Sequence, residues 1–214
     1  MTVQLHDIRP EPLVSTGINP RSDLFATEVN FEPGKSYLII ANSGKGKSTL
    51  LHILYGLRSD YSGRVLLDGR GGEQFSPDDW AELRQQKLSI VFQDLRLFPD
   101  LTALENIQLN NTLTSHKSEA QIRAMCTRLG IDHLLDQTAS TLSYGQRQRV
   151  AIVRALCQPF EFLLLDEPFS HLDDTNVRAA CELIAEEQER QGAGLLMVSL
   201  GEEYYFHYDK RLIL

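Results

Sequence analysis

The sequence predicts an α/β domain with a largely parallel β-sheet. Two observations favour this class. Short apolar runs of strand length, such as residues 37–40, alternate along the chain with segments whose apolar residues recur at helical spacing. The 214 residues also suffice for one domain with a full hydrophobic core.

Short strand patterns fill the first 93 residues, together with one helix signal. Residues 1–40 contain several such patterns, which are broken by three prolines between positions 10 and 20 and by a turn at residues 32–35. Residues 63–69 predict a strand that ends in an Asp-Gly turn. Ser76 followed by Pro77 predicts the start of a helix, with serine as the N-cap, and residues 87–93 return to a strand pattern.

Helical patterns dominate residues 94–157, and an α/β pattern resumes after them. Ser118 and Gln121 have the spacing of a capping box, and Gly130 ends the helix that they begin. Residues 160–168 then predict a buried strand, residues 173–191 a helix and residues 194–199 a last strong strand. We therefore expect a single domain over 1–214, with an α/β core of residues 1–93 and 158–214 and a helical subdomain of residues 94–157.

Composition limits the classes of partner. The formal net charge is −8 and the isoelectric point is near 5.2, which argues against a long nucleic acid as a partner. The three cysteines lack C-x-x-C spacing and are typical of a reducing compartment. No secretion signal is visible at the N-terminus, and no apolar run approaches the roughly 20 residues of a spanning helix. We expect a cytoplasmic protein that reaches a membrane only through a partner.

Residues 41–48, with the sequence ANSGKGKS, match the phosphate-loop pattern [AG]-x-x-x-x-G-K-[ST]. They lie between the strand pattern of residues 37–40 and a helical pattern with Leu50, Ile53, Leu54 and Leu57 on one face. Backbone amides at the start of a helix bind phosphate, Lys47 would neutralise it, and the Ser48 hydroxyl would bind Mg²⁺. The candidate phosphate-binding residues are Ala41, Asn42, Ser43, Gly44, Lys45, Gly46, Lys47, Ser48 and Thr49.

Ala41 stands where the pattern usually has glycine, and it fits there if its φ is negative. The alternative interpretation of the whole loop is a glycine-rich turn with solvated lysines.

Two further features point to phosphate chemistry. Ser143 and Gly145 lie at the predicted start of a helix, where free amides and the helix dipole favour an anion. The strand of residues 162–166 ends in Asp166 and Glu167. Asp166 suits contact with Mg²⁺ and Glu167 suits activation of a water molecule. The alternative for this pair of carboxylates is an ordinary solvated strand end.

The motifs and their order resemble those of the ATP-binding subunit of an ABC transporter. Residues 41–49 resemble its Walker A motif, Gln93 its Q-loop, LSYGQ at residues 142–146 its LSGGQ signature, residues 162–167 its Walker B motif and residues 170–174 its D-loop. Residues 92–107 look most like the small cassettes that serve lipoprotein-releasing, macrolide-exporting and cell-division complexes. The resemblance implies a P-loop NTPase (RecA-like) core with a parallel sheet, an N-terminal antiparallel β subdomain and an inserted helical subdomain.

The resemblance also implies roles for single residues. Glu167 and Gln93 would be catalytic, and Ser48, Gln93 and Asp166 would hold the metal. ATP and Mg²⁺ are the implied cofactors. Two chains would enclose two ATP molecules, and Asp173 would link the two sites across this homodimer. Each site would be completed in trans by the signature residues of the partner, Leu142, Ser143, Tyr144, Gly145 and Gln146. A groove beside residues 94–107 would take a helix from a transmembrane permease subunit.

Two positions depart from the family pattern. Residues 8–17 contain no aromatic residue to stack on adenine, and Phe25 or Tyr37 are the possible substitutes, although Tyr37 is expected to begin a core strand. Leu200 stands where the family has histidine, whereas His207 is expected on the surface. Leucine can neither donate nor accept a hydrogen bond, so hydrolysis is expected to be slow unless Ser199 or a water molecule replaces the contact.

Four functions remain to be compared. The first is an ATPase that powers a membrane permease, and the second is a weakly hydrolysing, nucleotide-gated switch that regulates a membrane partner. A small-molecule kinase has no need for the signature motif. A chromosome-maintenance cassette would carry a long coiled coil, for which residues 94–157 are too few.

Overall fold

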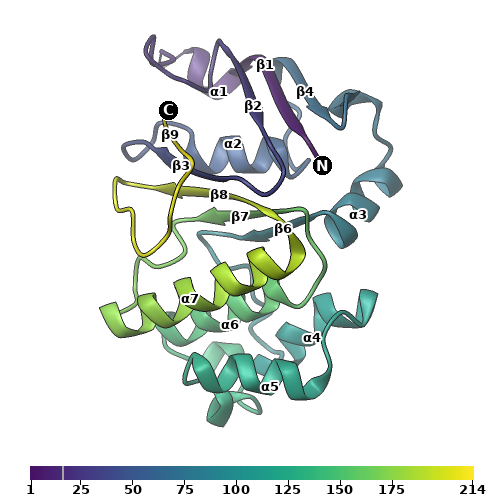
Figure 1. The fold of residues 1–214 in the computed structure, drawn as a ribbon, viewed down its shortest axis with the longest axis vertical. Coiled ribbons are helices and arrows are strands. Elements are labelled where there is room, and N and C mark those ends of the chain that lie inside the picture. Colours follow the sequence, from purple (N-terminus) through teal and green to yellow (C-terminus); the bar gives the residue numbers. More distant parts are fainter. Residues whose placement is uncertain (16) are drawn as a thin grey trace.

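A computed structural model describes residues 1–15 and 17–214. Two β-sheets lie one above the other, with helix α2 (Lys47–Leu54) between them (Figure 1). Below the lower sheet lie α4 (Ala103–Thr114), α5 (Glu119–Arg128), α6 (Tyr144–Leu156) and α7 (Asp174–Gln191). The upper sheet is antiparallel and has the strand order β2-β1-β4-β5. Its strands are β1 (Val3–Pro10), β2 (Glu28–Phe31), β4 (Tyr61–Leu67) and β5 (Arg70–Gly71).

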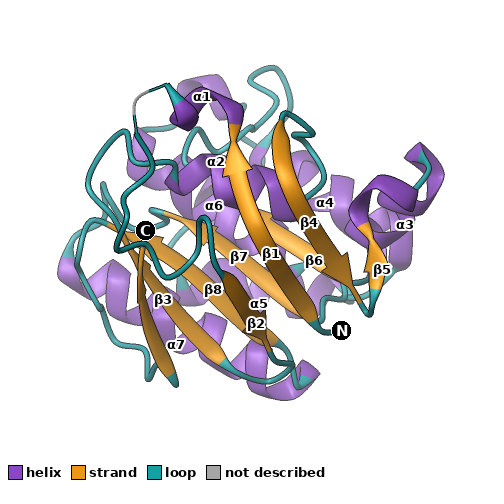
Figure 2. Ribbon diagram, turned by 90° about the horizontal axis from the view of Figure 1, so that it is seen from above, coloured by secondary structure: helices purple, strands orange, loops and turns teal. Residues whose placement is uncertain are grey.

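The lower sheet is parallel and has the strand order β6-β7-β8-β3-β9. Its strands are β3 (Ser36–Ile40), β6 (Leu88–Val91), β7 (Phe162–Asp166), β8 (Gly194–Ser199) and β9 (Lys210–Ile213). Seen from above, the antiparallel strands cross in front of this sheet (Figure 2). The carboxyl ends of parallel strands meet at one edge, so the loops that follow β3, β6, β7 and β8 are brought together there.

The helices cover both faces of the parallel sheet. Helix α2 (Lys47–Leu54) lies on the face toward the antiparallel sheet, whereas α6 and α7 lie on the opposite face, with α4 and α5 beyond them (Figure 1). The other helices are α1 (Glu11–Val14) and α3 (Pro77–Gln86). Short 3₁₀ turns are η1 (Gly72–Gln74), η2 (Asp132–Leu134) and η3 (Ala139–Thr141).

Capping boxes fix the starts of four helices. Ser76, Thr102, Ser118 and Ser143 each accept a hydrogen bond from the amide three residues later, and the side chain there accepts one from the cap amide. This satisfies two of the amides that a helix start leaves without partners. The helix starts predicted at Ser76 and Ser118 are therefore confirmed.

Apolar side chains of the parallel sheet point alternately into two hydrophobic cores. Leu38 packs with the α6 and α7 side, whereas Tyr37 and Ile39 pack with the α2 side. Because both faces are covered, the strands are continuous apolar runs rather than alternating ones. The predicted α/β class, with its parallel core sheet and N-terminal antiparallel sheet, is confirmed.

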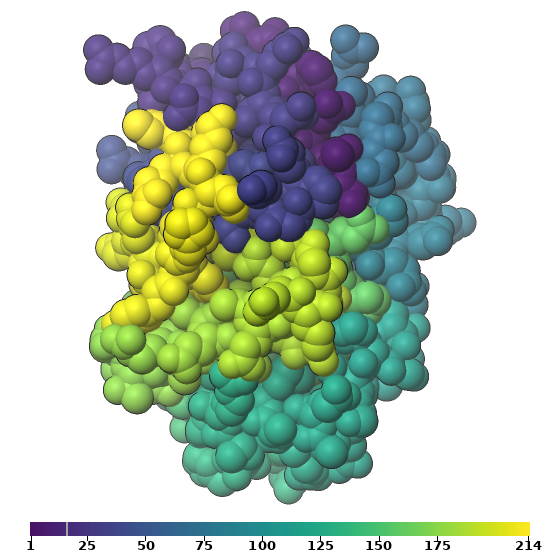
Figure 3. Space-filling view, in the orientation of Figure 1, coloured from purple at the N-terminus to yellow at the C-terminus, as the bar shows by residue number. Residues whose placement is uncertain are grey.

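Two local features differ from the sequence prediction. Leu57 was expected on the apolar face of the helix after the phosphate loop, but α2 ends at Leu54 and Leu57 is 44% exposed. Gly56 adopts a left-handed φ of 70° just beyond the cap, which turns the chain away. Strand β9 was not predicted; the C-terminal segment, yellow in Figure 3, lies beside residues of the N-terminal part and pairs with β3. No helix in the described ranges is long and apolar enough to cross a membrane.

Candidate functional site

The phosphate loop connects the end of β3 to the start of α2, as predicted. Gly44 and Gly46 have left-handed φ values of 75° and 97°. A Cβ atom on Gly46 would lie 2.5 Å from Leu13 Cδ1 and 3.0 Å from the Phe25 ring, and its φ is one that residues with a side chain rarely adopt, so any substitution there is strained. Ala41 is buried and is absent from the residues with positive φ, which meets the condition for alanine at this position.

Lys47 is buried at the start of α2 and is 6% exposed. Its ammonium group donates to the carbonyl oxygens of Ala41 and Asn42 at 3.0 and 3.2 Å. It also forms an ion pair with Glu167 Oε1 at 3.2 Å. The first amides of α2 have no acceptor within the helix. The loop therefore presents one fixed cation and several free amides, which is the arrangement that binds a phosphate group.

Both predicted carboxylates lie at the end of β7. Asp166 is 1% exposed, and its Oδ1 atom has no hydrogen-bond partner in the part of the chain that the structure describes. Burial raises the pKa of Asp166 above its usual range, and the nearby Ser48 hydroxyl opposes this. Glu167 has a left-handed φ of 47°, and its amide donates to the Val198 carbonyl at 3.1 Å. Backbone strain of this kind is frequent in functional sites.

The three predicted metal ligands lie around one cavity of about 390 Å³. Ser48 donates to Gln93 Oε1 at 3.3 Å. The cavity is lined by Ser48, His52, Gln93, Asp94, Tyr144 and Asp166. Within residues 1–15 and 17–214, no group of three His, Cys, Asp or Glu side chains could hold a metal by itself. One carboxylate with two neutral oxygens fits Mg²⁺, which usually completes its shell with water and phosphate oxygens.

The signature segment forms the start of helix α6. Ser143 is the N-cap: its hydroxyl accepts from the Gln146 amide, and Gln146 Oε1 accepts from the Ser143 amide. Leu142 is buried, whereas Ser143 is exposed. A Cβ on Gly145 would lie 3.0 Å from the His171 carbonyl oxygen, so the helix start packs closely on the D-loop. The predicted anion-binding amides of the signature are thus at a helix N-terminus.

One polar residue that the sequence did not single out, Gln148, connects these loops. Gln148 is buried; its Nε2 donates to the Glu167 carbonyl at 3.5 Å and its Oε1 accepts from the His171 amide at 3.3 Å. The sequence signal for this role is that Gln148 precedes Ala151 and Ile152 by three and four residues, which places a polar side chain on the apolar face of the predicted helix. Asp173 is the N-cap of α7, and its hydrogen bonds with Asn176 lower the pKa of the Asp173 carboxyl.

Neither possible substitute for the adenine-stacking aromatic is available. Phe25 is 3% exposed, and its ring lies 3.0 Å from the place of a Cβ on Gly46. Tyr37 is 4% exposed in β3, and its hydroxyl accepts from the Glu32 amide. Both rings are therefore part of the core beneath the loop, and the suggestion that one of them stacks on adenine is wrong.

Leu200 directly follows β8 and is 49% exposed. The Ser199 hydroxyl donates to the Glu202 carbonyl and accepts from the Gly201 amide at 2.8 and 3.0 Å. Ser199 is thereby occupied within its own turn, which counts against the suggestion that it replaces the missing histidine. His207 is exposed, as expected.

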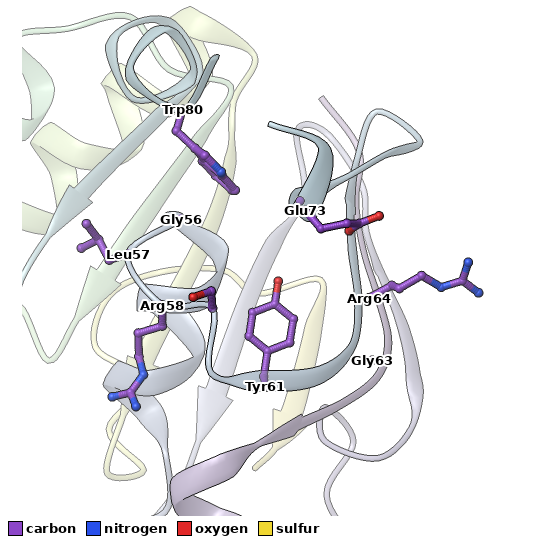
Figure 4. A pocket seen from close by; sticks show the side chains of 10 residues that line it. Gly56, Leu57, Arg58, Tyr61, Gly63, Arg64, Glu73 and Trp80 are labelled. Atoms are coloured by element: carbon purple, nitrogen blue, oxygen red, sulfur yellow. The ribbon is translucent and has the colours of Figure 1, made fainter. Parts of the chain in front are cut away.

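A second cavity, of about 480 Å³, lies between the end of α2, strand β4 and helix α3. Tyr61 and Trp80 point into it, whereas the guanidinium groups of Arg58 and Arg64 point away (Figure 4). None of its lining residues belongs to the phosphate loop or to the end of β7. It is therefore separate from the chemistry described above.

Comparisons with known proteins agree with this geometry. The sequence model of the ABC transporter family matches residues 24–170, which include the phosphate loop, Gln93, the signature and both carboxylates. A dimeric structure of MJ0796, a bacterial ABC transporter cassette, is similar with a TM-score of 0.79 and 27% sequence identity, covering 92% of this chain and 88% of that one. A second dimeric MJ0796 structure, in a post-hydrolysis state bound to ADP and Pi, has a TM-score of 0.77 and 27% identity over 92% and 87% of the chains. The chain therefore belongs to the ABC transporter family, as one of its ATP-binding cassettes.

Proposed function

We propose that this protein binds and hydrolyses Mg·ATP as the ATP-binding subunit of an ABC transporter. The observation that carries the proposal is the buried Lys47 ammonium, 3.2 Å from Glu167 Oε1, beside an Asp166 oxygen that has no hydrogen-bond partner among the described residues. A fixed cation, an unpaired buried acceptor and a helix start with free amides are what a nucleotide phosphate and its cation require.

Each residue then has a chemical task. A phosphate oxygen replaces Glu167 at the Lys47 ammonium, which frees the Glu167 carboxylate to accept a proton from the attacking water. Gln93 orients that water and, with Ser48 and Asp166, supplies the oxygen ligands for Mg²⁺. When bound there, Mg²⁺ neutralises charge that develops on the phosphate oxygens.

Two copies of the chain are needed for a complete site. One chain carries a phosphate loop and, at the start of α6, a second set of amides together with the exposed Ser143. We propose that Ser143, Gly145 and Gln146 contact the γ-phosphate bound by a partner copy, and that Asp173 links the two sites. The dimeric arrangement of MJ0796, in one structure with ADP and Pi, supports a symmetric homodimer.

The membrane partner would be a separate permease, which places this chain on the cytoplasmic face of the membrane. Phe98, Leu109 and Leu113 are 57%, 37% and 62% exposed on the segment that begins after Gln93. Exposed apolar side chains close to a functional loop are typical of a protein-interaction surface. In this proposal residues 94–157 move relative to the core of residues 1–93 and 158–214 and transmit the state of the nucleotide to the permease. The subtype of cassette remains a prediction from residues 92–107.

A nucleotide-gated switch is the second candidate, and Leu200 favours it. An apolar, exposed residue beyond β8 supplies no hydrogen bond to the γ-phosphate, and Ser199 is occupied elsewhere. Such a protein would bind ATP and dimerise but hydrolyse ATP very slowly. The rate of hydrolysis when the membrane partner is bound distinguishes a transporter engine from a switch.

ATP binding by the parent and by Lys47→Ala tests the proposal. Lys47→Ala removes a charged hydrogen-bond donor to phosphate, which is expected to weaken binding roughly 10- to 100-fold. Lys210→Ala is the control, because Lys210 is an exposed lysine of β9 outside the phosphate loop. Isothermal titration with Mg·ATP measures both. Equal affinities of Lys47→Ala and the parent would rule out the assigned site.

A further inference from the structure

Tyr144 connects the signature helix to the Q-loop of its own chain. Its hydroxyl donates to the backbone carbonyl of Gln93 at 2.7 Å, across 51 residues of sequence. Tyr144 is the first residue of α6, and Gln93 follows the end of β6. The side-chain Oε1 atom of Gln93 also accepts a hydrogen bond from the Ser48 hydroxyl, at 3.3 Å. Gln93 thus connects the start of α6, through its backbone carbonyl, to the cavity of the proposed metal site, through its side chain.

The ring of Tyr144 also contacts the D-loop. Its centroid lies 4.2 Å from that of His171, with 50° between the ring planes. His171 is held in place by Ser170, whose hydroxyl lies 2.9 Å from His171 Nδ1, and by Gln148, which accepts from its amide. The first two turns of α6 therefore contact loops on both sides of the cavity, at Gln93 and at residues 167–171.

We propose that Tyr144 is a positioning residue that couples the two ATP sites of a dimer. The inference rests on the proposed function, in which Ser143 contacts the nucleotide of the partner. Tyr144 is the next residue, so a phosphate that fixes Ser143 also fixes the Tyr144 hydroxyl and, through it, the backbone of Gln93. ATP in the partner's site thereby sets the position of Gln93, which in this chain's own site binds Mg²⁺ and orients the water.

The coupling depends on the tyrosine hydroxyl. Glycine, which the family signature LSGGQ has at this place, carries no side chain that could reach Gln93 or His171. Phenylalanine keeps the ring contact with His171 but loses the bond to Gln93. Tyr144→Phe therefore separates the two contacts, and it leaves the amides of the α6 N-terminus unchanged.

The test compares Tyr144→Phe with Tyr61→Phe, which removes a hydroxyl from the separate cavity shown in Figure 4. ATP binding, single-turnover phosphate release and the ATP dependence of the steady-state rate are measured for both variants and the parent. For Tyr144→Phe we expect an unchanged Kd for ATP, a rate about fivefold to tenfold lower, and a Hill coefficient reduced toward that of independent sites. Tyr61→Phe is expected to match the parent in all three.

The outcomes separate this inference from the proposed function. If the parent binds ATP without cooperativity, or if Tyr144→Phe keeps both its rate and its Hill coefficient, the coupling role is wrong and the proposed function stands. A lower rate with an unchanged Hill coefficient also overturns the coupling, because the hydroxyl would then act within one site only. If the parent binds no ATP, the proposed function fails and this inference with it. Melting temperatures of the variants show whether a loss of stability accounts for any change.

Discussion

Replacing Leu200 with histidine tests whether a missing hydrogen-bond donor limits hydrolysis. Val198 pairs with Asp166 in the sheet, and its carbonyl accepts the Glu167 amide at 3.1 Å. Position 200 is therefore two residues beyond the point where β8 lies directly beside the end of β7 that carries Asp166 and Glu167. The Leu200 side chain is 49% exposed, so an imidazole can be introduced without disturbing the core.

The expected gain follows from the value of one preorganised donor. Loss of such a donor to charge that develops in the transition state costs about 2.7–4 kcal/mol, or roughly 100- to 1,000-fold in kcat. Ser199 offers no replacement, because its hydroxyl is bound to Glu202 and Gly201. The loop that carries Leu200 is not shaped to aim an imidazole at the phosphate, so histidine should recover only part of this stabilisation of the transition state. We therefore expect Leu200→His to raise kcat by about 10-fold or more.

Steady-state phosphate release at saturating Mg·ATP measures the effect, and KM is expected to change little. Leu200→Phe is the control, because it introduces a ring of similar size without a donor and should leave kcat at the parental value. Rapid hydrolysis by the parent, together with no change in Leu200→His, would refute the reasoning that this site is impaired.

Three further predictions follow from the described contacts. Gly46→Ala combines a strained left-handed φ with a Cβ 2.5 Å from Leu13 Cδ1 and should weaken ATP binding strongly in a titration, whereas Gly44→Ala is strained in φ but meets no atom of the described residues within 4 Å and should lose less affinity. Arg154 is 8% exposed and donates to two backbone carbonyls just after Gln93, so Arg154→Ala should lower the free energy of unfolding in urea by about 2–4 kcal/mol. Hydrogen bonds from Arg70 and from the Ser76 cap lower the pKa of Asp79 from 3.8 to about 2. The ionised carboxylate therefore stabilises the fold above about pH 4, and this contribution is lost as the pH falls toward 2, so the stability difference between Asp79→Asn and the parent should shrink over that interval.

Local patterns predicted most of the elements that form the site. The apolar run of residues 37–40, the glycine loop and the helical spacing after it correspond to β3, the phosphate loop and α2. Serine caps predicted helix starts correctly, because a cap and its partner lie three residues apart and the interaction is local. Strand β9 was not predicted, because it is a short edge strand whose only pairing partner is the distant strand β3.

Contacts between distant segments could not be derived from the sequence. The sequence allows Phe25 as an adenine-stacking ring, but in the structure its side chain is buried beneath Gly46. Tyr144 was assigned to the signature alone, whereas its hydroxyl reaches Gln93 in the same chain. Spacing along the chain carries no information on such pairs, because they depend on how α6 packs on the end of the sheet.

Whether ATP joins two copies of this chain into a hydrolytic dimer is decided by the size of the Glu167→Gln variant with and without nucleotide. This variant lacks the base but keeps Lys47, Ser48 and Asp166, so ATP is bound and not cleaved. Light scattering after size exclusion should give a monomer without nucleotide and a dimer with Mg·ATP, and the added substitution Ser143→Arg should abolish the dimer without weakening ATP binding. A Glu167→Gln variant that binds ATP and remains a monomer would contradict the account.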